Sequence, residues 1–286
     1  MLKEVVEFYA PRELEEAHGL LLKHYPHAQL VGGGLDLTWR ERKETRYLIG
    51  LDRLPLKFIK SEEGTLEVGA MVTIRELLEN EALENVAPDS LKPALKAIAT
   101  PLLRGVITVG GSLARAYPWS DLPALFLGLE SKIGIFDGKY RVFELREFYE
   151  GDFREILRRA LITKVLIPQS KGRYFSYRRF TRTGVDIPLL NQAVSLHFRE
   201  GKIEHARIFL GARPGFPLEL EEIEGLLEGK ELSESVIGET CAMLRESAPV
   251  ESDFRISKEF RIHLAGVLLE ENLREIKGKY ESSIQA

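Results

Sequence analysis

Hydrophobic and polar positions along the first 54 residues alternate between the periods of strands and of helices. Apolar runs at residues 5–8, 29–31 and 46–49 predict three short strands. Between the first two, a segment that opens at Pro11 and continues to about Tyr25 places its leucines on one face, as an amphipathic helix does. We therefore expect a βαββ order in a first unit, residues 1–54.

Residues 55–168 continue this alternation and are expected to form a second unit. Residues 57–59 and 65–68 predict a hairpin, and Thr73 followed by Glu76 has the spacing of a capping box at the start of a helix. The glycine-rich residues 108–112 fall between an apolar pair and a helix-like segment. Further helices are expected over 91–99 and 122–129, and strands over 132–136, 139–143 and 161–167.

A third unit, residues 171–286, follows a polar stretch. Strands are expected over residues 174–180, 187–196 and 203–210, and helices close the chain, the longest over 256–276. The rings of Tyr174, Tyr177 and Phe180 are expected to share one buried strand face. The acidic run 219–224 is expected to be the solvated start of a helix.

The composition excludes several classes of function. The 286 residues carry a formal charge of −4, which predicts no general attraction to nucleic acid. No apolar run approaches the roughly 18 residues of a membrane span and the first residues lack a signal-peptide core, so we expect a cytoplasmic protein.

Cys241 is the only cysteine, so the chain has no ligand set for an iron–sulfur cluster of its own. His24 and His27 lack a third ligand and are expected to be solvated, so no metal site is predicted.

Two glycine clusters carry the chemistry that the sequence predicts. Residues 32–34 are three glycines that follow a strand, and Gly110 and Gly111 follow an apolar pair. Because glycine lacks a Cβ, we expect φ > 0 at Gly110 and Gly111, which would turn consecutive N–H groups toward an anion. The hydroxyls of Thr108 and Ser112 would be further donors. Two such bends far apart in the chain predict one bound molecule with an extended diphosphate. Residues 32–37 lack the third glycine of a dinucleotide fingerprint, and the separate stretch 225–230 is one residue short of a P-loop.

At these residues the chain resembles the FAD-binding subunit of the molybdenum hydroxylases, the family of xanthine dehydrogenase and carbon monoxide dehydrogenase. In that family an Ala-Gly-Gly-x-Asp/Ser-Leu turn and a Thr-Ile-Gly-Gly-Asn/Ser-Leu-Ala turn enclose the FAD diphosphate. This chain has Gly-Gly-Gly-Leu-Asp-Leu at residues 32–37 and Thr-Val-Gly-Gly-Ser-Leu-Ala at residues 108–114. Residues 117–124 and 176–191 resemble two further family segments, so the resemblance covers nearly the full length.

The resemblance implies an α+β fold: a two-subdomain FAD-binding domain of the vanillyl-alcohol-oxidase (PCMH) type, followed by an α+β C-terminal domain of the carbon monoxide dehydrogenase flavoprotein type. It also implies FAD as the cofactor and no catalytic residue for substrate oxidation on this chain. The residues expected to bind FAD are Val31, Gly32, Gly33, Gly34, Leu35, Asp36, Arg104, Thr108, Val109, Gly110, Gly111, Ser112, Asp121, Leu161, Ile162 and Arg178.

Individual roles for some of these residues follow from the resemblance alone. Arg178 stands where the family often has a lysine near the flavin ring, so its cation would stabilise negative charge on the reduced ring. Asp121 would accept a hydrogen bond from the ribityl chain or from neighbouring backbone donors. Leu161 and Ile162 would pack near the adenine or the flavin. The chain departs from the family pattern at four positions: Leu35, Gly105, Tyr117 and Trp119.

The function implied by the resemblance is electron transfer inside a multi-chain enzyme. A molybdopterin-binding large subunit would oxidise the substrate, a subunit with two [2Fe–2S] clusters would relay single electrons, and FAD on this chain would pass pairs to an acceptor such as NAD or a quinone. A dimer of such heterotrimers is one arrangement. Two alternatives stay open: a non-redox scaffold that kept the fold without FAD, to which the bulky Tyr117 and Trp119 point, and a stand-alone flavin reductase or oxidase.

Overall fold

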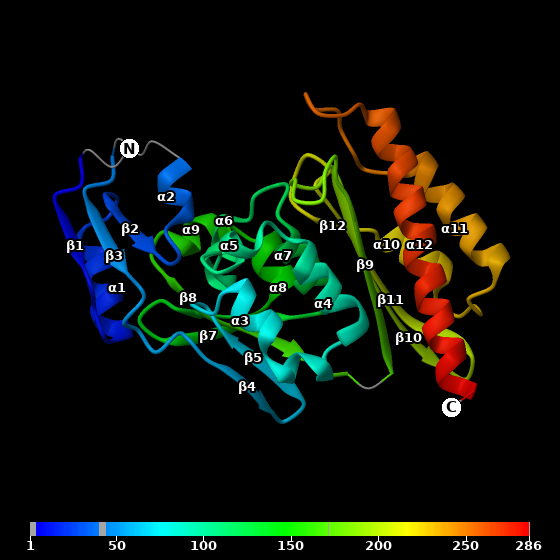
Figure 1. Cartoon of the computed structure of the whole chain (residues 1–286), viewed down its shortest axis with the longest axis horizontal. Coiled ribbons are helices and arrows are strands. Elements are labelled where there is room, and N and C mark those ends of the chain that lie inside the picture. Colours follow the sequence, from blue (N-terminus) through cyan, green and yellow to red (C-terminus); the bar gives the residue numbers. More distant parts are fainter. Residues whose placement is uncertain (1–3, 40–43, 171, 286) are drawn as a thin grey trace. The chain divides into compact units, whose positions relative to one another are not determined.

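The chain divides into two compact units in a computed structural model that describes residues 4–39, 44–170 and 172–285 (Figure 1). The first unit comprises Met1–Ala82, Thr100–Arg115 and Glu130–Pro168, and the second comprises Leu83–Ala99, Ala116–Leu129 and Gln169–Ala286. The predicted α+β class is confirmed, because each unit combines helices with sheets. The boundaries expected near residues 54 and 170 stay predictions. None of the helices within the described ranges is both long and apolar enough to span a bilayer.

The first unit begins with a three-stranded parallel sheet, ordered β1-β3-β2. One helix packs on β2 and β3 and buries Leu14, Ala17 and Leu21, whose three- and four-residue spacing places them on a single face. These side chains join Ile49 and Leu161 in one hydrophobic cluster. The elements are β1 (Glu7–Tyr9), α1 (Leu14–Lys23), β2 (Ala28–Val31), α2 (Leu35–Trp39) and β3 (Tyr47–Gly50).

A five-stranded antiparallel sheet, ordered β4-β5-β8-β6-β7, forms the rest of the strand structure of this unit. Its register places Thr65 opposite Pro168 and Ile133 opposite Val165. The strands are β4 (Ile59–Glu62), β5 (Thr65–Gly69), β6 (Lys132–Phe136), β7 (Tyr140–Glu144) and β8 (Leu161–Pro168).

The first predicted hairpin is present, but its leading strand is Ile59–Glu62 and not residues 57–59. Glu63 and Gly64 form the turn with φ of 47° and 72°, so the strand that pairs with β5 is β4. The sequence of β4 is mostly exposed and charged, so it lacks the alternation of apolar and polar residues that predicts a strand. An edge strand tolerates such polar residues because its outer side is solvated.

The described part of the first unit contains five further short helices. The capping box predicted at Thr73 is confirmed: its hydroxyl accepts the N–H of Glu76, and the Glu76 carboxylate accepts the N–H of Thr73. The helix that follows Thr108 packs on β5 and β8. The helices are α3 (Ile74–Glu79), α5 (Pro101–Arg104), α6 (Val109–Arg115), α8 (Leu145–Glu150) and α9 (Phe153–Leu157). The 3₁₀ helix η1 (Glu81–Asn85) leads from this unit into the next.

The second unit is built on a four-stranded antiparallel sheet, ordered β12-β11-β10-β9, with helices on its two faces (Figure 1). Residues 190–196 are buried without interruption, because α4 and α7 pack on the sheet as well as α10 and α12. The strands are β9 (Arg173–Phe180), β10 (Leu190–Arg199), β11 (Lys202–Gly211) and β12 (Leu218–Glu219). The helices are α4 (Pro88–Ala97), α7 (Asp121–Gly128), α10 (Glu221–Leu227), α11 (Glu234–Ser247) and α12 (Lys258–Gln285).

Two expectations for this unit are wrong. Tyr174 and Phe180 pack against the core cluster of the C-terminal helices, whereas Tyr177 contacts Asp121 on the opposite face, because side chains alternate along a strand. The acidic run is also not fully solvated. Glu224 is buried, and its carboxylate accepts the N–H of Ile208 at 2.7 Å, since α10 lies against β11.

Candidate functional site

The two glycine bends meet inside the first unit. A Cβ on Gly33 would lie 1.6 Å from the carbonyl oxygen of Val106, and a Cβ on Gly32 would lie 3.0 Å from Oγ1 of Thr108. A backbone this close leaves no room for a side chain at Gly33, so this position requires glycine for steric reasons. The loop after β2 therefore lies directly on the segment that enters α6.

The second bend has a different geometry from the one expected. Gly110 and Gly111 lie in the first turn of α6 and do not adopt φ > 0; the left-handed conformation occurs at Gly34, with φ of 74°. Glycine at residue 110 instead permits close packing, because a Cβ there would lie 2.6 Å from Cβ of Ala70. Thr108 caps this turn by accepting the N–H of Gly111 at 3.2 Å.

The backbone at the first bend is suited to bind an anion. The hydrogen bonds recorded among the described residues do not involve the N–H groups of Gly32, Gly33 or Gly34. The space beside Gly34 is open, since nothing lies within 4 Å of the position its Cβ would take. Successive N–H groups at a bend, next to the start of a helix, form a cradle for phosphate oxygens. The residues present therefore fit the diphosphate of a dinucleotide.

An ion pair connects the helices that follow the two bends. Nε of Arg115 lies 3.0 Å from Oδ1 of Asp36, and both side chains are largely buried. Asp36 was predicted to bind the cofactor, and the structure places its carboxylate against Arg115. Arg115 is not identifiable from the sequence alone, because no local pattern connects the end of one helix to the start of another.

The remaining candidates of the first unit lie on four different elements, β2, α2, α5 and β8. Val31 ends β2, Leu35 begins α2, and Arg104 is a half-buried residue at the end of α5. Leu161 is completely buried against side chains of α1, and its neighbour Ile162 pairs with Ile135 in the sheet. The Leu161 side chain is therefore part of the core.

Asp121 belongs to the second unit and has protein partners there. Its Oδ1 accepts the hydroxyl of Tyr177 at 2.6 Å and lies 3.1 Å from Nε of Arg179. Burial raises the pKa of the Asp121 carboxyl, while Arg179 and the hydrogen bonds oppose the increase. The carboxylate stands at the first residue of α7, a favourable place for negative charge.

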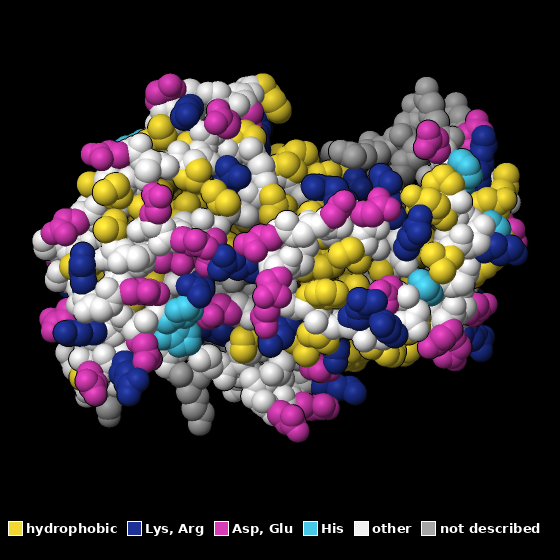
Figure 2. Space-filling view, turned by 180° about the vertical axis from the view of Figure 1, so that it is seen from behind, with side chains coloured by type: hydrophobic (Ala, Val, Ile, Leu, Met, Phe, Trp, Pro, Cys, Tyr) yellow, Lys and Arg dark blue, Asp and Glu magenta, His cyan; other side chains and the backbone are white. Residues whose placement is uncertain are grey.

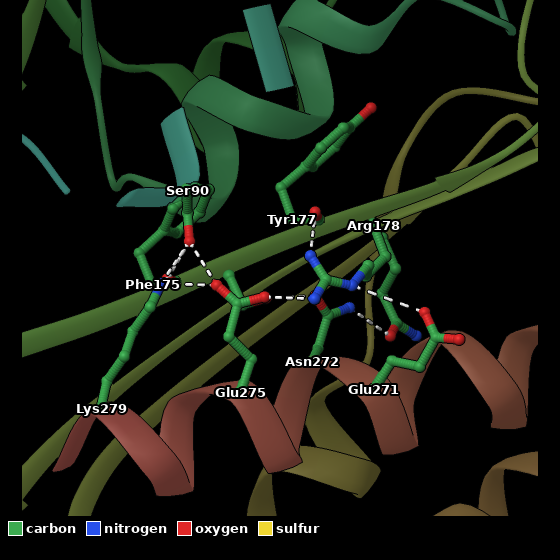
Figure 3. Close-up of polar contacts among 10 residues, drawn as sticks. Ser90, Phe175, Tyr177, Arg178, Glu271, Asn272, Glu275 and Lys279 are labelled. Carbon is green, nitrogen blue, oxygen red and sulfur yellow. Dashed lines mark hydrogen bonds and ion pairs between the residues drawn. The ribbon is translucent and has the colours of Figure 1, made fainter. Parts of the chain in front are cut away.

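Arg178 is paired with acidic side chains of α12 (Figure 3). Its Nη2 lies 2.5 Å from Oε2 of Glu275, and its Nε lies 3.4 Å from Oε2 of Glu271. Burial alone would raise the pKa of Glu275, but hydrogen bonds from Lys279 and Ser90 and the charge of Arg178 lower it. Within its own unit Arg178 therefore ties β9 to α12.

Neither histidine near the end of α1 forms part of a metal site in the described residues. His24 is not solvated as expected: its ring stacks on Tyr47 with centroids 3.8 Å apart and on Tyr9 at 5.3 Å. Tyr9 lies on β1 and Tyr47 on the adjacent strand β3, so both rings shield the His24 ring from solvent. On the face shown in Figure 2, acidic and basic side chains are intermixed.

Two protein-family models match the chain in succession. The model described as the FAD binding domain in molybdopterin dehydrogenase matches residues 4–170, and the CO dehydrogenase flavoprotein C-terminal domain matches residues 175–276. The carbon monoxide dehydrogenase medium chain of Afipia carboxidovorans is 29% identical, covering 98% of this chain and 99% of the relative. The xanthine dehydrogenase FAD-binding subunit of Escherichia coli O157:H7 is 24% identical, covering 89% and 90%.

Solved structures have the same fold along almost the whole chain. A chain of the carbon monoxide dehydrogenase from Oligotropha carboxidovorans superposes with a TM-score of 0.87 at 27% identity, covering 97% of this chain and 99% of that one. A chain of quinoline 2-oxidoreductase from Pseudomonas putida 86 gives the same TM-score and coverage at 25% identity.

Proposed function

Because this chain belongs to the family of FAD-binding medium subunits of molybdenum hydroxylases, we propose that it transfers electrons between the iron–sulfur clusters of a partner chain and a diffusible acceptor. FAD is its cofactor, and the chain is a subunit of an FAD-dependent oxidoreductase. The convergence of the two glycine bends is the observation that carries the proposal, because it brings two distant segments into contact beside the N–H groups of residues 32–34.

The residues of the first unit would hold the diphosphate through the backbone. The N–H groups of residues 32–36 would point at its oxygens, and the hydroxyl of Ser112 would add a donor. The N–H groups of residues 109–112, expected to be further donors, are already bonded to Val72, Ala70 and Thr108. Thr108 stabilises the first turn of α6, because its Oγ1 accepts the Gly111 N–H. Bound FAD supplies the ability to exchange electrons singly or in pairs.

The other residues carried over from the family keep roles that are part of the proposal. Arg104 and the strand segment Leu161–Ile162 would border the cofactor, with the Leu161 side chain holding that strand in the core. Asp121 would hold the start of α7 in position through its contacts with Tyr177 and Arg179. Arg178 would place a cation near the flavin, an effect that Glu271 and Glu275 would weaken through their negative charges.

Partner chains must supply the remaining redox centres. With Cys241 as its only cysteine, this chain has no ligands for an iron–sulfur cluster. A [2Fe–2S] subunit would deliver single electrons, and a molybdopterin-binding large subunit would oxidise the substrate. A dimer of heterotrimers is one arrangement of these chains, and NAD or a quinone is an example of the acceptor.

The experiment is to purify the chain, titrate it with FAD, and measure reduction with and without the proposed partner chains. We expect a flavin absorbance spectrum with one FAD per chain, and reduction by substrate only when iron–sulfur and molybdenum subunits are present. A colourless chain that ignores added FAD would support the scaffold alternative instead. Turnover of NADH by the isolated chain would support a stand-alone reductase.

A further inference from the structure

In the sheet of the second unit, β11 lies between β10 and the very short strand β12 (Figure 1). β11 pairs with β10 along its whole length, but among the described residues β12 pairs only with Phe209 and Leu210. A strand edge without a partner presents backbone N–H and C=O groups to which a strand of another molecule can bond. The outward-facing groups of residues 203, 206 and 208, which we name the β11 edge, therefore need other partners.

Two glutamates bind N–H groups of the β11 edge. Oε1 of Glu224 accepts the N–H of Ile208 at 2.7 Å, and Oε1 of Glu228 accepts the N–H of Ala206 at 3.1 Å. Glu224 lies in α10, and Glu228 is one helical turn further on, where its N–H donates to the Glu224 carbonyl. Four residues of a helix span about 6 Å, and two residues of a strand span about 6.6 Å. The two carboxylates are therefore spaced to meet both N–H groups at once.

The other groups of the β11 edge also have partners within the chain. The segments that enter and leave α10 bond to residues 203 and 208, and a guanidinium bonds to residue 206. These bonds join the Leu220 N–H to the Ile208 carbonyl at 2.8 Å, Arg207 Nη1 to the Ala206 carbonyl at 2.9 Å, the Ile203 N–H to the Lys230 carbonyl at 2.9 Å, and the Gly229 N–H to the Ile203 carbonyl at 2.8 Å. The three edge residues are completely buried, where a backbone group without a partner is costly. Residues 220–230 thus satisfy this edge as a longer strand would.

The two glutamates differ in how firmly they are held. The side chain of Glu224 is 5% exposed, and its Oε2 lies 3.2 Å from Nη1 of Arg207. The α10 side chains Ile223 and Leu227 belong to the core cluster, so packing keeps this carboxylate in place. Glu228 is 41% exposed and directly follows α10. The Glu228 side chain can therefore be replaced without opening the core.

We propose that Glu224 and Glu228 keep the β11 edge closed to a second copy of this chain, by occupying the N–H groups that an added strand would use. A second copy is the partner that fits, because antiparallel pairing of β11 with itself would bring N–H and C=O groups of equal spacing together about a twofold axis. Charged side chains at a sheet edge commonly prevent such pairing. The inference goes beyond the proposed function, because it involves neither FAD nor the partner chains.

The test compares loss of the hydrogen-bond acceptors with loss of the charge alone. The double variant Glu224→Ala, Glu228→Ala has no acceptor at either position, whereas in Glu224→Gln, Glu228→Gln each side chain keeps an oxygen that can accept an N–H. Sedimentation velocity of the full chain at increasing concentration measures self-association, and hydrogen exchange of the peptide that contains residues 203–210 measures opening of the edge. We expect the double alanine variant to exchange these amides about 10-fold faster and to self-associate about 10-fold more tightly than the parent. The double glutamine variant should match the parent in both measurements.

A single variant keeps the test decisive if the double alanine variant does not fold. Glu228→Ala removes the exposed acceptor alone and should change both measurements in the same direction, by a smaller factor. Glu222→Ala is the matched control, because this glutamate is exposed on the same helix, and it should leave both measurements unchanged.

Three results would overturn the proposal. In the first, the alanine variants exchange the edge amides at the rate of the parent, so the carboxylates do not protect them. In the second, these amides exchange faster but the association state stays that of the parent. In the third, the glutamine and alanine variants self-associate equally, which would mean that charge, and not occupancy of the N–H groups, keeps the copies apart.

Discussion

Nε of Arg115 in the last turn of α6 lies 3.0 Å from Oδ1 of Asp36 in the first turn of α2. At the other end of α6, the glycine loop lies on Val106 and Thr108. The segment that begins at residue 32 is therefore held at both ends of α6. Arg115 also pairs with a carboxylate only two residues from Gly34, where the proposed cradle would hold the diphosphate.

This ion pair predicts unequal effects of removing its two members. Arg115→Gln would leave the negative charge of Asp36 uncompensated beside the diphosphate, so we expect FAD affinity to fall about 10-fold, equivalent to about 1.4 kcal/mol. Asp36→Asn would remove that charge and leave the arginine near the phosphates, so we expect a smaller loss of FAD affinity or none. Titration of the apoprotein with FAD at low and high salt measures both. Equal losses that do not depend on salt would mean that the pair acts only as a mechanical link.

The contact between the two bends predicts that Gly33 tolerates no side chain. Gly33→Ala would place a Cβ 1.6 Å from a backbone carbonyl, which cannot move aside as a flexible side chain does. We expect a stability loss of about 2–3 kcal/mol and at least a 10-fold loss in FAD affinity. Gly19→Ala is the control, since that glycine lies in α1 with nothing within 4 Å of its Cβ position and should be neutral or slightly stabilising. Full FAD binding by Gly33→Ala would contradict the convergence of the bends.

The buried pair of Asp121 and Arg179 predicts a strong structural effect. Asp121→Asn would leave the Arg179 guanidinium buried without a counter-charge, so we expect a loss of about 3 kcal/mol in urea unfolding. Tyr177→Phe removes one buried hydrogen bond and should cost about 1 kcal/mol. The exposed pair Arg182–Asp186 is the control, and Arg182→Gln should cost under about 0.5 kcal/mol. If Asp121→Asn left stability intact but altered FAD affinity, a direct contact with the cofactor would replace the positioning role.

Glu224 predicts that stability falls with rising pH. Burial raises the pKa of this carboxyl from an ordinary value of 4.5 to about 8, the nearby Glu219 adds to the increase, and the Ile208 N–H and Arg207 only partly oppose it. Between these two values the folded chain keeps a proton that the unfolded chain has released, so this contribution is complete below pH 4.5 and is lost as the pH rises through 8.

The measurement is urea unfolding of the chain and of Glu224→Gln between pH 5 and pH 8.5. We expect the parent chain to lose about 2–4 kcal/mol over this range relative to the variant, whose side chain does not titrate. Parallel curves for the two proteins would mean that Glu224 is ionised in the folded state throughout.

Much of the fold follows from short-range patterns that act within a few residues. Helical spacing of Leu14, Ala17 and Leu21, the Thr73 capping box and the Asp137-Gly138 turn each predict their element correctly, because the physical cause lies inside the element itself. The charged strand β4 and the short helix α2 escaped prediction, since neither has a clear apolar period.

The sequence by itself determined that two glycine bends exist, which residues form them, and that the chain belongs with FAD-binding subunits, because these features are written in contiguous motifs. Only the tertiary structure decided why each glycine is needed: Gly33 for contact with Val106, Gly110 for contact with Ala70, and Gly34 for its φ. It also decided which charges pair, placing Asp36 on Arg115 and Asp121 on Arg179. The packing of strands and helices determines which charged residues far apart in the chain form ion pairs, and no local sequence pattern contains that information.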